Sequence, residues 1–301
     1  MQVIKITPRG YCQGVTHALR LVKDTIRNHP DEPIYLLGMI VNNQLVNQAL
    51  LQKNVSLLDN SKTKEEWLDT IDDGIIVISA HGVKPALSEK IRQKGLKVVD
   101  ATCQYVAYGQ KLVLSYLAEG YEVLYIGEKD HPEAQAVVGI APRRIRLITN
   151  AQQLSELGPL NEKLLVTTQT TMNYQTIDEL FTLIKQNYPQ ALILDEICSA
   201  TRRRQQALYD LNEALDLLLV VGDPSSNNAN KLLEIGRHKA IPRVELLSCV
   251  ADLATIDLRD IKKVGVTSAA STPTYLTDQV IKYLQDHPRG KIPSLDLKQV
   301  L

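Results

Sequence analysis

Short apolar runs recur along the chain in a pattern that repeats three times, and this repeat limits the fold more than any other feature. Most runs are continuous in Val, Ile and Leu rather than alternating, as in strands that are covered on both faces. Longer segments with helical spacing separate them, as in Val15–Asn28, which ends just before Pro30. Strands that alternate with helices predict an α/β fold with mainly parallel sheet.

The runs predict twelve strands in three sets of four. The expected strands are Val3–Thr7, Ile34–Leu37, Val55–Leu58 and Ile75–Ser79, then Val98–Asp100, Glu122–Ile126, Ile145–Ile148 and Leu164–Thr168, then Ala191–Leu194, Leu217–Val221, Val244–Leu247 and Val264–Thr267. The sets predict three similar small α/β domains, at residues 1–96, 97–190 and 191–284, in a pseudo-threefold (trefoil) arrangement around a central site. Residues 285–301 form a C-terminal tail outside the repeat.

The composition narrows the class of protein. Lys plus Arg is 34 and Asp plus Glu is 34, so the zero net charge gives no global reason to bind nucleic acid. The single Phe and single Trp predict an aliphatic core. No apolar run approaches the roughly 18 residues of a membrane span, and residues 1–10 lack a secretory signal pattern. We therefore expect a cytoplasmic protein that does not bind a membrane.

A cysteine follows the first strand of each set. Cys12, Cys103 and Cys198 lie 91 and 95 residues apart, each between a strand end and a helix start. A helix N-terminus favours the thiolate, which is the form that binds metal. Three such thiolates could hold an iron–sulfur cluster, or zinc, with one metal position left open for a substrate. The alternative is a buried small apolar residue, which we expect for Cys249 because it has no counterpart in the other sets.

Small polar residues and histidines are dense at the other predicted strand ends. They are Asn42, Asn43 and His81 in the first set, His131, Glu133, Gln169, Thr170 and Thr171 in the second, and Ser225, Ser226, Asn227, Asn228, Asn230 and Ser271 in the third. Hydroxyls, amides and imidazoles at helix starts can bind an anion without lysines, which favours phosphate or diphosphate. Taken singly, each is also explained as a helix cap or an ordinary loop residue.

Two further features bear on the chemistry. Glu133 is the carboxylate that we expect to act as a proton donor, working with Thr170. The run Arg202–Arg204, on the helix after Cys198, is expected to be a solvated face, or else a docking site for an acidic electron carrier.

Several motifs in order resemble the 4-hydroxy-3-methylbut-2-enyl diphosphate reductase family. They are P-R-G-Y-C-Q-G-V, S-A-H-G-V, D-A-T-C, H-P-E, T-Q-T-T, I-C-x-A-T around Cys198 and the Ser/Asn-rich loop near Ser226, within residues 1–285. The resemblance implies three α/β domains around an oxygen-sensitive [4Fe-4S] cluster. It also implies reductive removal of the allylic hydroxyl to give isopentenyl and dimethylallyl diphosphate, the last step of the non-mevalonate isoprenoid pathway, with ferredoxin or flavodoxin as electron donor.

The resemblance also implies roles for single residues. Cys12, Cys103 and Cys198 would hold the cluster, Glu133 would deliver protons and Thr170 would contact the substrate hydroxyl. The diphosphate would be bound by residues at His81, His131, Ser226, Asn228 and Ser271.

The chain departs from the family pattern at three other positions, and its S-A-T-R-R-R segment is more basic than the common form. Asn42 stands where the family has a diphosphate-contacting histidine, Asn227 stands where a second serine is expected, and Gln104 replaces a proline. Asparagine can donate a hydrogen bond but cannot carry a positive charge. Two alternatives therefore stay open, a diverged reductase of another substrate and a cluster-bearing sensor or binding protein without turnover. The presence of Glu133 and Thr170 argues against the sensor, which needs no proton path.

Overall fold

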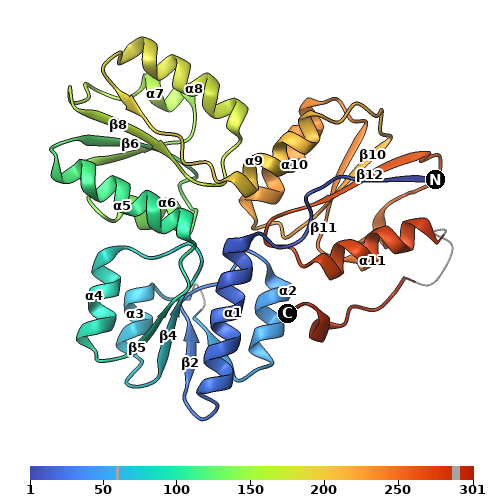
Figure 1. The fold of residues 1–301 in the computed structure, drawn as a ribbon, viewed down its shortest axis with the longest axis horizontal. Coiled ribbons are helices and arrows are strands. Elements are labelled where there is room, and N and C mark those ends of the chain that lie inside the picture. The colour runs from blue at the N-terminus through green and yellow to red at the C-terminus, as the bar shows by residue number, and fades with distance from the viewer. Residues whose placement is uncertain (59–60, 287–291) are drawn as a thin grey trace. The chain divides into compact units, whose positions relative to one another are not determined.

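The computed structural model describes residues 1–58, 61–286 and 292–301 (Figure 1). These residues contain three four-stranded sheets in which all neighbouring strands are parallel. The strands are β1 (Gln2–Lys5), β2 (Ile34–Leu36), β3 (Val55–Leu57), β4 (Ile75–Ile78), β5 (Lys97–Asp100), β6 (Glu122–Ile126), β7 (Ile145–Ile148), β8 (Leu164–Thr168), β9 (Leu192–Ile193), β10 (Leu217–Val221), β11 (Arg243–Leu247) and β12 (Lys263–Ser268). The α/β class and the twelve predicted strands are confirmed, with some strand ends displaced by a residue or two.

Helices follow the strands in alternation. They are α1 (Gln13–Asn28), α2 (Gln44–Leu51), α3 (Lys64–Asp69), α4 (Pro85–Gln93), α5 (Gln104–Ala118), α6 (Pro132–Val138), α7 (Ala151–Ser155), α8 (Tyr174–Asn187), α9 (Ser199–Tyr209), α10 (Asn227–His238) and α11 (Thr274–Gln285), with short 3-10 helices η1 (Val250–Thr255) and η2 (Leu297–Gln299). The predicted helix Val15–Asn28 is confirmed as α1. None of the helices in the described residues is long and apolar enough to cross a membrane.

The three sheets have the same strand order, which confirms the repeat but corrects the sets. The orders are β5-β4-β2-β3, β9-β8-β6-β7 and β1-β12-β10-β11. The strand before each cysteine is therefore an edge strand of a sheet whose other three strands are not the next three in sequence. β5 and β9 each join the three strands that precede them, and β1 joins the last three strands of the chain, β10–β12. The expected grouping of this strand with the three that follow it is wrong. The helix α4 connects β4 to β5, and these two strands pair in parallel.

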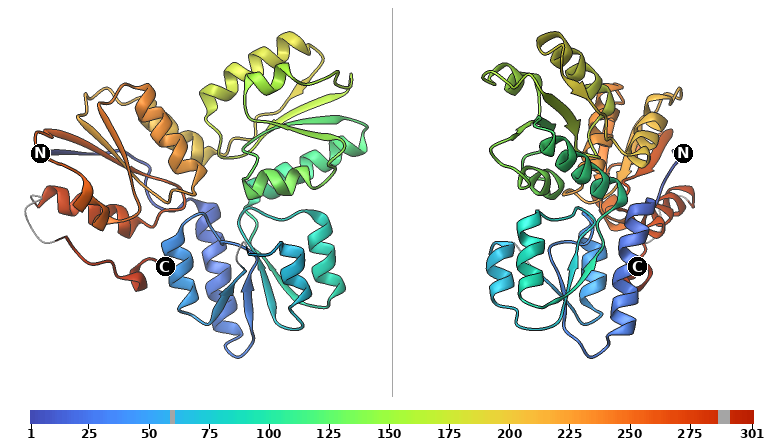
Figure 2. Two further views of the ribbon diagram at one scale, coloured as in Figure 1. Left: turned by 180° about the vertical axis from the view of Figure 1, so that it is seen from behind. Right: turned by 60° about the vertical axis from the view of Figure 1, so that its left-hand side comes forward.

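The β6–β9 sheet illustrates how each sheet is buried. Alternate residues of β6 face opposite sides, so Leu124 and Ile126 pack against α7 and α8, whereas Val123 and Tyr125 pack against α5 and α6. Figure 2 shows these two helix pairs on opposite faces of the sheet. Two covered faces explain why the strands are continuous apolar runs. The core of this sheet is mainly aliphatic, as the composition predicts.

The chain divides into two compact units. Unit 1 comprises residues 1–16, 41–54 and 199–301, and unit 2 comprises residues 17–40 and 55–198. Unit 1 contains the β1/β10–β12 sheet, and unit 2 contains the β2–β5 and β6–β9 sheets. The domain boundaries at residues 96, 190 and 284 stay a prediction.

The C-terminal tail belongs to unit 1. Its predicted range, 285–301, begins at the end of α11 and includes residues 287–291, which lie outside the described residues. Further on, η2 packs against α2, and the Tyr11 hydroxyl donates a hydrogen bond of 2.8 Å to the Val300 carbonyl. The tail therefore contacts the loop that leads into Cys12.

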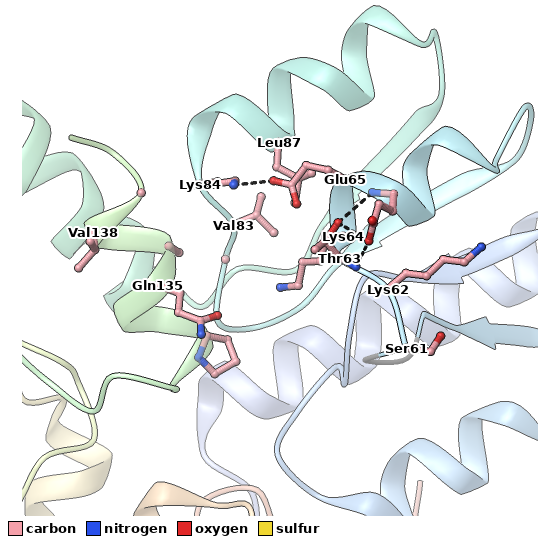
Figure 3. A pocket seen from close by; sticks show the side chains of 15 residues that line it. Ser61, Lys62, Thr63, Lys64, Glu65, Val83, Lys84, Leu87, Gln135 and Val138 are labelled. Carbon is pink, nitrogen blue, oxygen red and sulfur yellow. Dashed lines mark hydrogen bonds and ion pairs between the residues drawn. The ribbon is translucent and has the colours of Figure 1, made fainter. Parts of the chain in front are cut away.

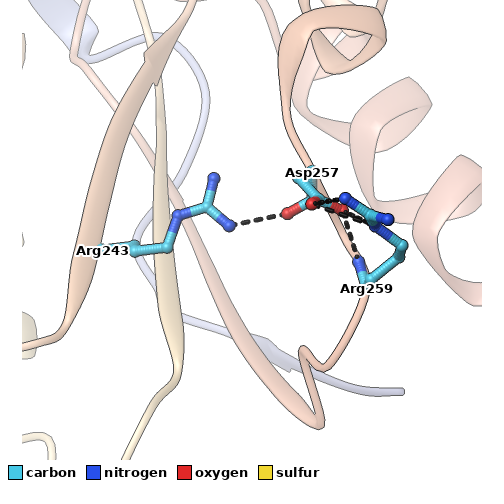
Figure 4. Close-up of polar contacts among 3 residues, drawn as sticks. All are labelled: Arg243, Asp257 and Arg259. Atoms are coloured by element: carbon cyan, nitrogen blue, oxygen red, sulfur yellow. Dashed lines mark hydrogen bonds and ion pairs between the residues drawn. The ribbon is translucent and has the colours of Figure 1, made fainter.

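Unit 1 also carries an exposed ionic cluster, shown in Figure 4. The Arg259 guanidinium donates to both Asp257 carboxylate oxygens, and Arg243 donates to the Asp257 carbonyl at 2.6 Å. The hydrogen bonds from Arg259 lower the pKa of Asp257 to about 2. Water screens these charges, so the cluster fixes the loop after η1 but adds little stability.

Candidate active site

The same backbone hydrogen bond recurs at the three repeated cysteines. The N–H of Cys12 donates to the Ala270 carbonyl at 3.1 Å, that of Cys103 to the Ala80 carbonyl at 3.0 Å, and that of Cys198 to Thr170 at 3.1 Å. Each acceptor lies in the polar loop after the strand that neighbours the cysteine's own strand. Each cysteine is therefore tied to a loop that carries a predicted site residue: Ser271, His81 and Thr170.

The three thiols share their setting. Cys12, Cys103 and Cys198 are partly buried, lie outside any disulfide, and stand directly before α1, α5 and α9. Cys12 belongs to unit 1 and the other two belong to unit 2. In the described part of the chain, no three His, Cys, Asp or Glu side chains are grouped as a metal site. Cys249 is buried beside η1, as expected of a core residue.

Glu133 lies in unit 2 at the start of α6, with only 3% of its surface exposed. Its Oε1 accepts from the Thr170 N–H at 2.8 Å, and its Oε2 accepts from the Thr170 hydroxyl at 2.8 Å. The Tyr125 hydroxyl donates to Oε1 at 3.4 Å. The sequence-predicted pair of Glu133 and Thr170 is therefore in direct contact.

Burial raises the pKa of Glu133 to about 7, although the hydrogen bonds from Thr170 and Tyr125 oppose the shift. A carboxyl group with this pKa is partly protonated near neutral pH, so it can both donate and accept a proton. Sequence reasoning missed Tyr125. The available signal was one tyrosine among the aliphatic residues 123–126 of β6.

The raised pKa of Glu133 predicts a pH-dependent stability. Its folded-state pKa of about 7 lies above its ordinary value of 4.5, so the folded state favours the protonated carboxyl. This contribution is complete below pH 4.5 and is lost as the pH rises toward 7, with a total on the order of 3 kcal/mol. We expect the unfolding free energy of the wild type, minus that of Glu133→Gln, to fall across this window in urea titrations. A difference that stays constant with pH would contradict the assignment.

The two predicted histidines of unit 2 lie side by side. The rings of His81 and His131 pack edge to face with their centroids 5.3 Å apart. His131 caps α6, and its Nδ1 accepts from the Glu133 N–H at 3.2 Å, so the ring proton is on Nε2. Burial lowers the pKa of His131 to about 4, and burial followed by the charges of His131 and Lys64 lowers that of His81 to about 3. Both rings are therefore neutral hydrogen-bonding groups at pH 7.

The polar residues predicted in unit 1 also lie together. The Ser271 hydroxyl donates to the Asn42 carbonyl at 2.9 Å and lies 3.4 Å from the Ser226 hydroxyl. Ser226 is the N-cap of α10, so the alternative interpretation as a helix cap is correct for it. Asn228 accepts from the Ala270 N–H at 3.0 Å. Asn227 is the first residue of α10 and is partly buried.

The expectation that Arg202–Arg204 form a solvated face is wrong for Arg204, which is buried. Arg203 is exposed and Arg202 is partly exposed, but only 3% of Arg204 is accessible. Its guanidinium donates to the Gly10 carbonyl at 2.6 Å and to the Ala200 carbonyl at 3.0 Å. Arg204 therefore holds the turn before Cys12, a role that its place in a run of three arginines concealed.

Gly10 forms that turn and leaves no room for a side chain. Its φ is +79°, its N–H donates to the Ser268 hydroxyl at 3.0 Å, and an added Cβ would collide with the Thr274 side chain. We expect Gly10→Ala to lower the free energy of unfolding by about 1–3 kcal/mol, because it combines backbone strain with overpacking. Chemical denaturation measures this, with Gly95→Ala as control. Gly95 also has a positive φ, but nothing lies within 4 Å of its added Cβ. Equal losses in the two variants would contradict the steric argument.

Comparison with protein families gives a match over nearly the whole chain. The family model described as "LytB protein" matches residues 3–285, which include every predicted site residue. The chain belongs to this family.

LytB relatives cover nearly the same range. A 4-hydroxy-3-methylbut-2-enyl diphosphate reductase of Geobacillus sp. (strain WCH70) is 40% identical over 95% of this chain and 90% of its own length. Its namesake in Brevibacillus brevis is 43% identical over 95% of this chain and 92% of its own length. The solved E-1-hydroxy-2-methyl-but-2-enyl-4-diphosphate reductase of Plasmodium falciparum matches with a TM-score of 0.89 and 30% identity, over 99% of this chain and 96% of that one.

Proposed function

We propose that this chain is a 4-hydroxy-3-methylbut-2-enyl diphosphate reductase. The reaction adds two electrons and two protons to the substrate, breaks its allylic C–O bond and releases water, leaving isopentenyl or dimethylallyl diphosphate. The observation that carries the proposal is the buried Glu133–Thr170 pair beside Cys198 in a chain of the LytB family. A proton donor next to a cysteine of the repeat is what such a reduction requires.

We assign Cys12, Cys103 and Cys198 as the ligands of one [4Fe-4S] cluster. Their chemistry fits this role, because three thiols without disulfides each precede a helix whose first N–H groups favour anionic ligands. A cluster held by three protein ligands would supply the electrons and an iron atom with an open position. Within its own unit, each of these cysteines is positioned by the backbone hydrogen bond described above.

The hydrogen bonds of Glu133 determine which oxygen can carry the mobile proton. Oε1 already accepts the N–H of Thr170, so the proton of the neutral acid belongs on Oε2. Oε2 faces the Thr170 hydroxyl at 2.8 Å. The protonated Glu133 therefore donates to the Thr170 oxygen, which frees the hydroxyl hydrogen of Thr170 to donate to the substrate. The two side chains together pass a proton toward the leaving hydroxyl.

The diphosphate group would be bound by neutral donors. In unit 2 these are the ring N–H groups of His81 and His131, and in unit 1 they are Ser226, Asn228 and Ser271, with Asn42 and Asn227 at the altered positions. A neutral hydrogen-bond donor contributes less to anion binding than a charged one. We also propose that ferredoxin or flavodoxin reduces the enzyme in the cytoplasm.

Anaerobic purification and turnover test the proposal. The protein should contain iron and sulfide near four each per chain, as a [4Fe-4S] cluster requires. With a chemical reductant it should convert 4-hydroxy-3-methylbut-2-enyl diphosphate to the two products, measured by mass spectrometry. Cluster without turnover of this substrate would overturn the proposal and support a diverged reductase or a sensor.

A further inference from the structure

Tyr125 interrupts the aliphatic pattern of the repeat next to the predicted proton donor. The equivalent strands β2, β6 and β10 each lead into a glycine, and the residue two places before that glycine is Leu36, Tyr125 or Val220. All three side chains are buried. The aliphatic counterparts show that this position needs no hydroxyl for packing. The hydroxyl occurs in the repeat that carries Glu133 on the following helix.

The Tyr125 ring is fixed by its neighbours in unit 2. It belongs to the same core group as Val137 of α6. A Cβ added to Gly127 would lie 3.1 Å from Cε1 of Tyr125 and 3.0 Å from Oε1 of Gln169. Glycine at this position therefore leaves room for both side chains, and the packed ring holds its hydroxyl at Glu133.

A pocket of unit 2 lies along α6 but does not include Glu133. Gln135 and Val138 of α6 line this pocket, as Figure 3 shows. Glu133 is not one of the described residues that line it, and it contacts Tyr125 and Thr170 instead. Because only 3% of Glu133 is exposed, protein groups rather than water in the pocket set its acidity.

The Tyr125 hydroxyl has one hydrogen-bond partner among the described residues, Oε1 of Glu133 at 3.4 Å. A buried tyrosine hydroxyl usually has such a partner. Burial, then the charge and hydrogen bond of Glu133 and the charge of Glu196, raise the pKa of Tyr125, so the hydroxyl stays protonated and donates. This bond is longer than the usual spacing of about 2.5–3.0 Å, and hydrogen bonds at catalytic groups often shorten when the substrate is bound.

Two donors on one oxygen determine where the acidic proton of Glu133 lies. Oε1 accepts from both the Thr170 N–H and the Tyr125 hydroxyl. A proton on Oε1 would leave the Tyr125 hydrogen without an acceptor among the described residues, which is unfavourable for a buried donor. The neighbouring His131 ring accepts the Glu133 N–H and is neutral. The proton therefore belongs on Oε2, which faces the Thr170 hydroxyl.

We propose that Tyr125 is a positioning residue that keeps the acidic proton of Glu133 on Oε2 and makes Glu133 a stronger acid. Tyr125 gives up no proton itself. When the proton of Oε2 passes to the Thr170 oxygen, the hydrogen bond from Tyr125 stabilises the negative charge that remains on Glu133. The inference deepens the proposed function and rests on it for the role of Glu133 in turnover.

Infrared titration of the holoenzyme measures the pKa of Glu133 without turnover. The C=O band of the protonated carboxyl is identified as the band that Glu133→Gln lacks. In Tyr125→Phe, which keeps the ring, the pKa should rise by about 0.5–1 pH unit because one hydrogen bond to the carboxylate is removed. Tyr125→Leu, with the side chain found at the equivalent place in β2, should shift the pKa in the same direction.

Tyr116→Phe is the matched control for these variants. Tyr116 packs against the same core group as Tyr125, and its ring lies edge to face with that of Tyr121. Removal of its hydroxyl should leave the pKa of Glu133 unchanged. Iron content and thermal melts that match the wild type exclude misfolding in each variant.

The pH dependence of turnover gives a second measurement. In Tyr125→Phe the decline in rate above pH 7 should move to higher pH by the same amount as the pKa. On the acidic side of this decline the rate should fall by about 3- to 10-fold, because Glu133 is then a weaker acid. The KM for the substrate should stay unchanged, since Tyr125 is buried and acts through Glu133.

The outcomes separate this inference from the proposed function. If the pKa of Glu133 in Tyr125→Phe and Tyr125→Leu equals that of the wild type or falls below it, the role of Tyr125 is refuted, whereas wild-type turnover still supports the reductase. If the pKa rises but the wild type does not reduce the substrate, Tyr125 keeps its role and the proposed function fails. An equal rise in Tyr116→Phe would also overturn the inference, because the hydroxyl at Glu133 would not be its cause.

Discussion

Cys198→Ser is expected to lose its iron–sulfur cluster and its activity. Serine has the size of cysteine but is a poor ligand for iron that prefers thiolate. Bound iron and sulfide should fall to a small fraction of the wild-type content. Turnover should fall by more than ~100-fold, beyond the effect of removing an outer partner of a metal ligand. Anaerobic reconstitution followed by metal analysis and visible absorption measures the loss.

Cys249→Ser is the matched control for this variant. Cys249 is buried next to η1 and has no equivalent in the other two repeats. It should keep full cluster content and turnover even if its stability drops slightly. Cys12→Ser and Cys103→Ser should behave like Cys198→Ser. Full cluster content in any of these three variants would remove that cysteine from the ligand set.

Glu133→Gln is expected to keep the cluster and lose turnover by about 100- to 10,000-fold, the usual contribution of a general acid. Glutamine can still accept the Thr170 N–H with its amide oxygen and can donate an amide N–H to the Thr170 hydroxyl oxygen, but it has no acidic proton to give. The wild-type rate should decline as the pH rises above 7, because the pKa of Glu133 is raised to about 7 and the acid must be protonated. Stopped-flow or steady-state assays with a chemical reductant across this range measure both effects.

The variant Glu133→Asp provides the comparison for this prediction. It keeps an ionisable group but retracts the carboxyl from Thr170, so we expect a partial activity whose pH dependence persists. A Glu133→Gln enzyme that works at the wild-type rate would show that the proton comes from elsewhere. Loss of iron from Glu133→Gln would instead point to a structural role for this carboxyl.

The strands could be predicted because their residues are apolar on both faces. Runs such as Ile75–Ile78 and Leu217–Val221 are entirely buried. Sheet membership could not be predicted in the same way. β5 pairs with β4 because α4 connects these two strands in space. The order of strands along the sequence does not show which strands become neighbours in a sheet.

The site was predictable where a loop motif follows a buried strand. Glu133, Thr170, His81 and His131 were predicted because strand ends of parallel sheets gather ligand-binding residues, and the structure places Glu133 against Thr170 and His81 against His131. The burial of Arg204 was not predicted, since it depends on a contact with a distant segment, the Gly10 turn. The bonding of Asn42 to Ser271 is likewise a matter of tertiary structure.

The backbone bond from each repeated cysteine has a consequence for how this architecture can diversify. The acceptor is a peptide carbonyl, so the anchor at Ala80, Thr170 or Ala270 does not depend on which side chain occupies the loop. Side chains in these loops can therefore be substituted during evolution while the backbone hydrogen bond that positions each cysteine is kept.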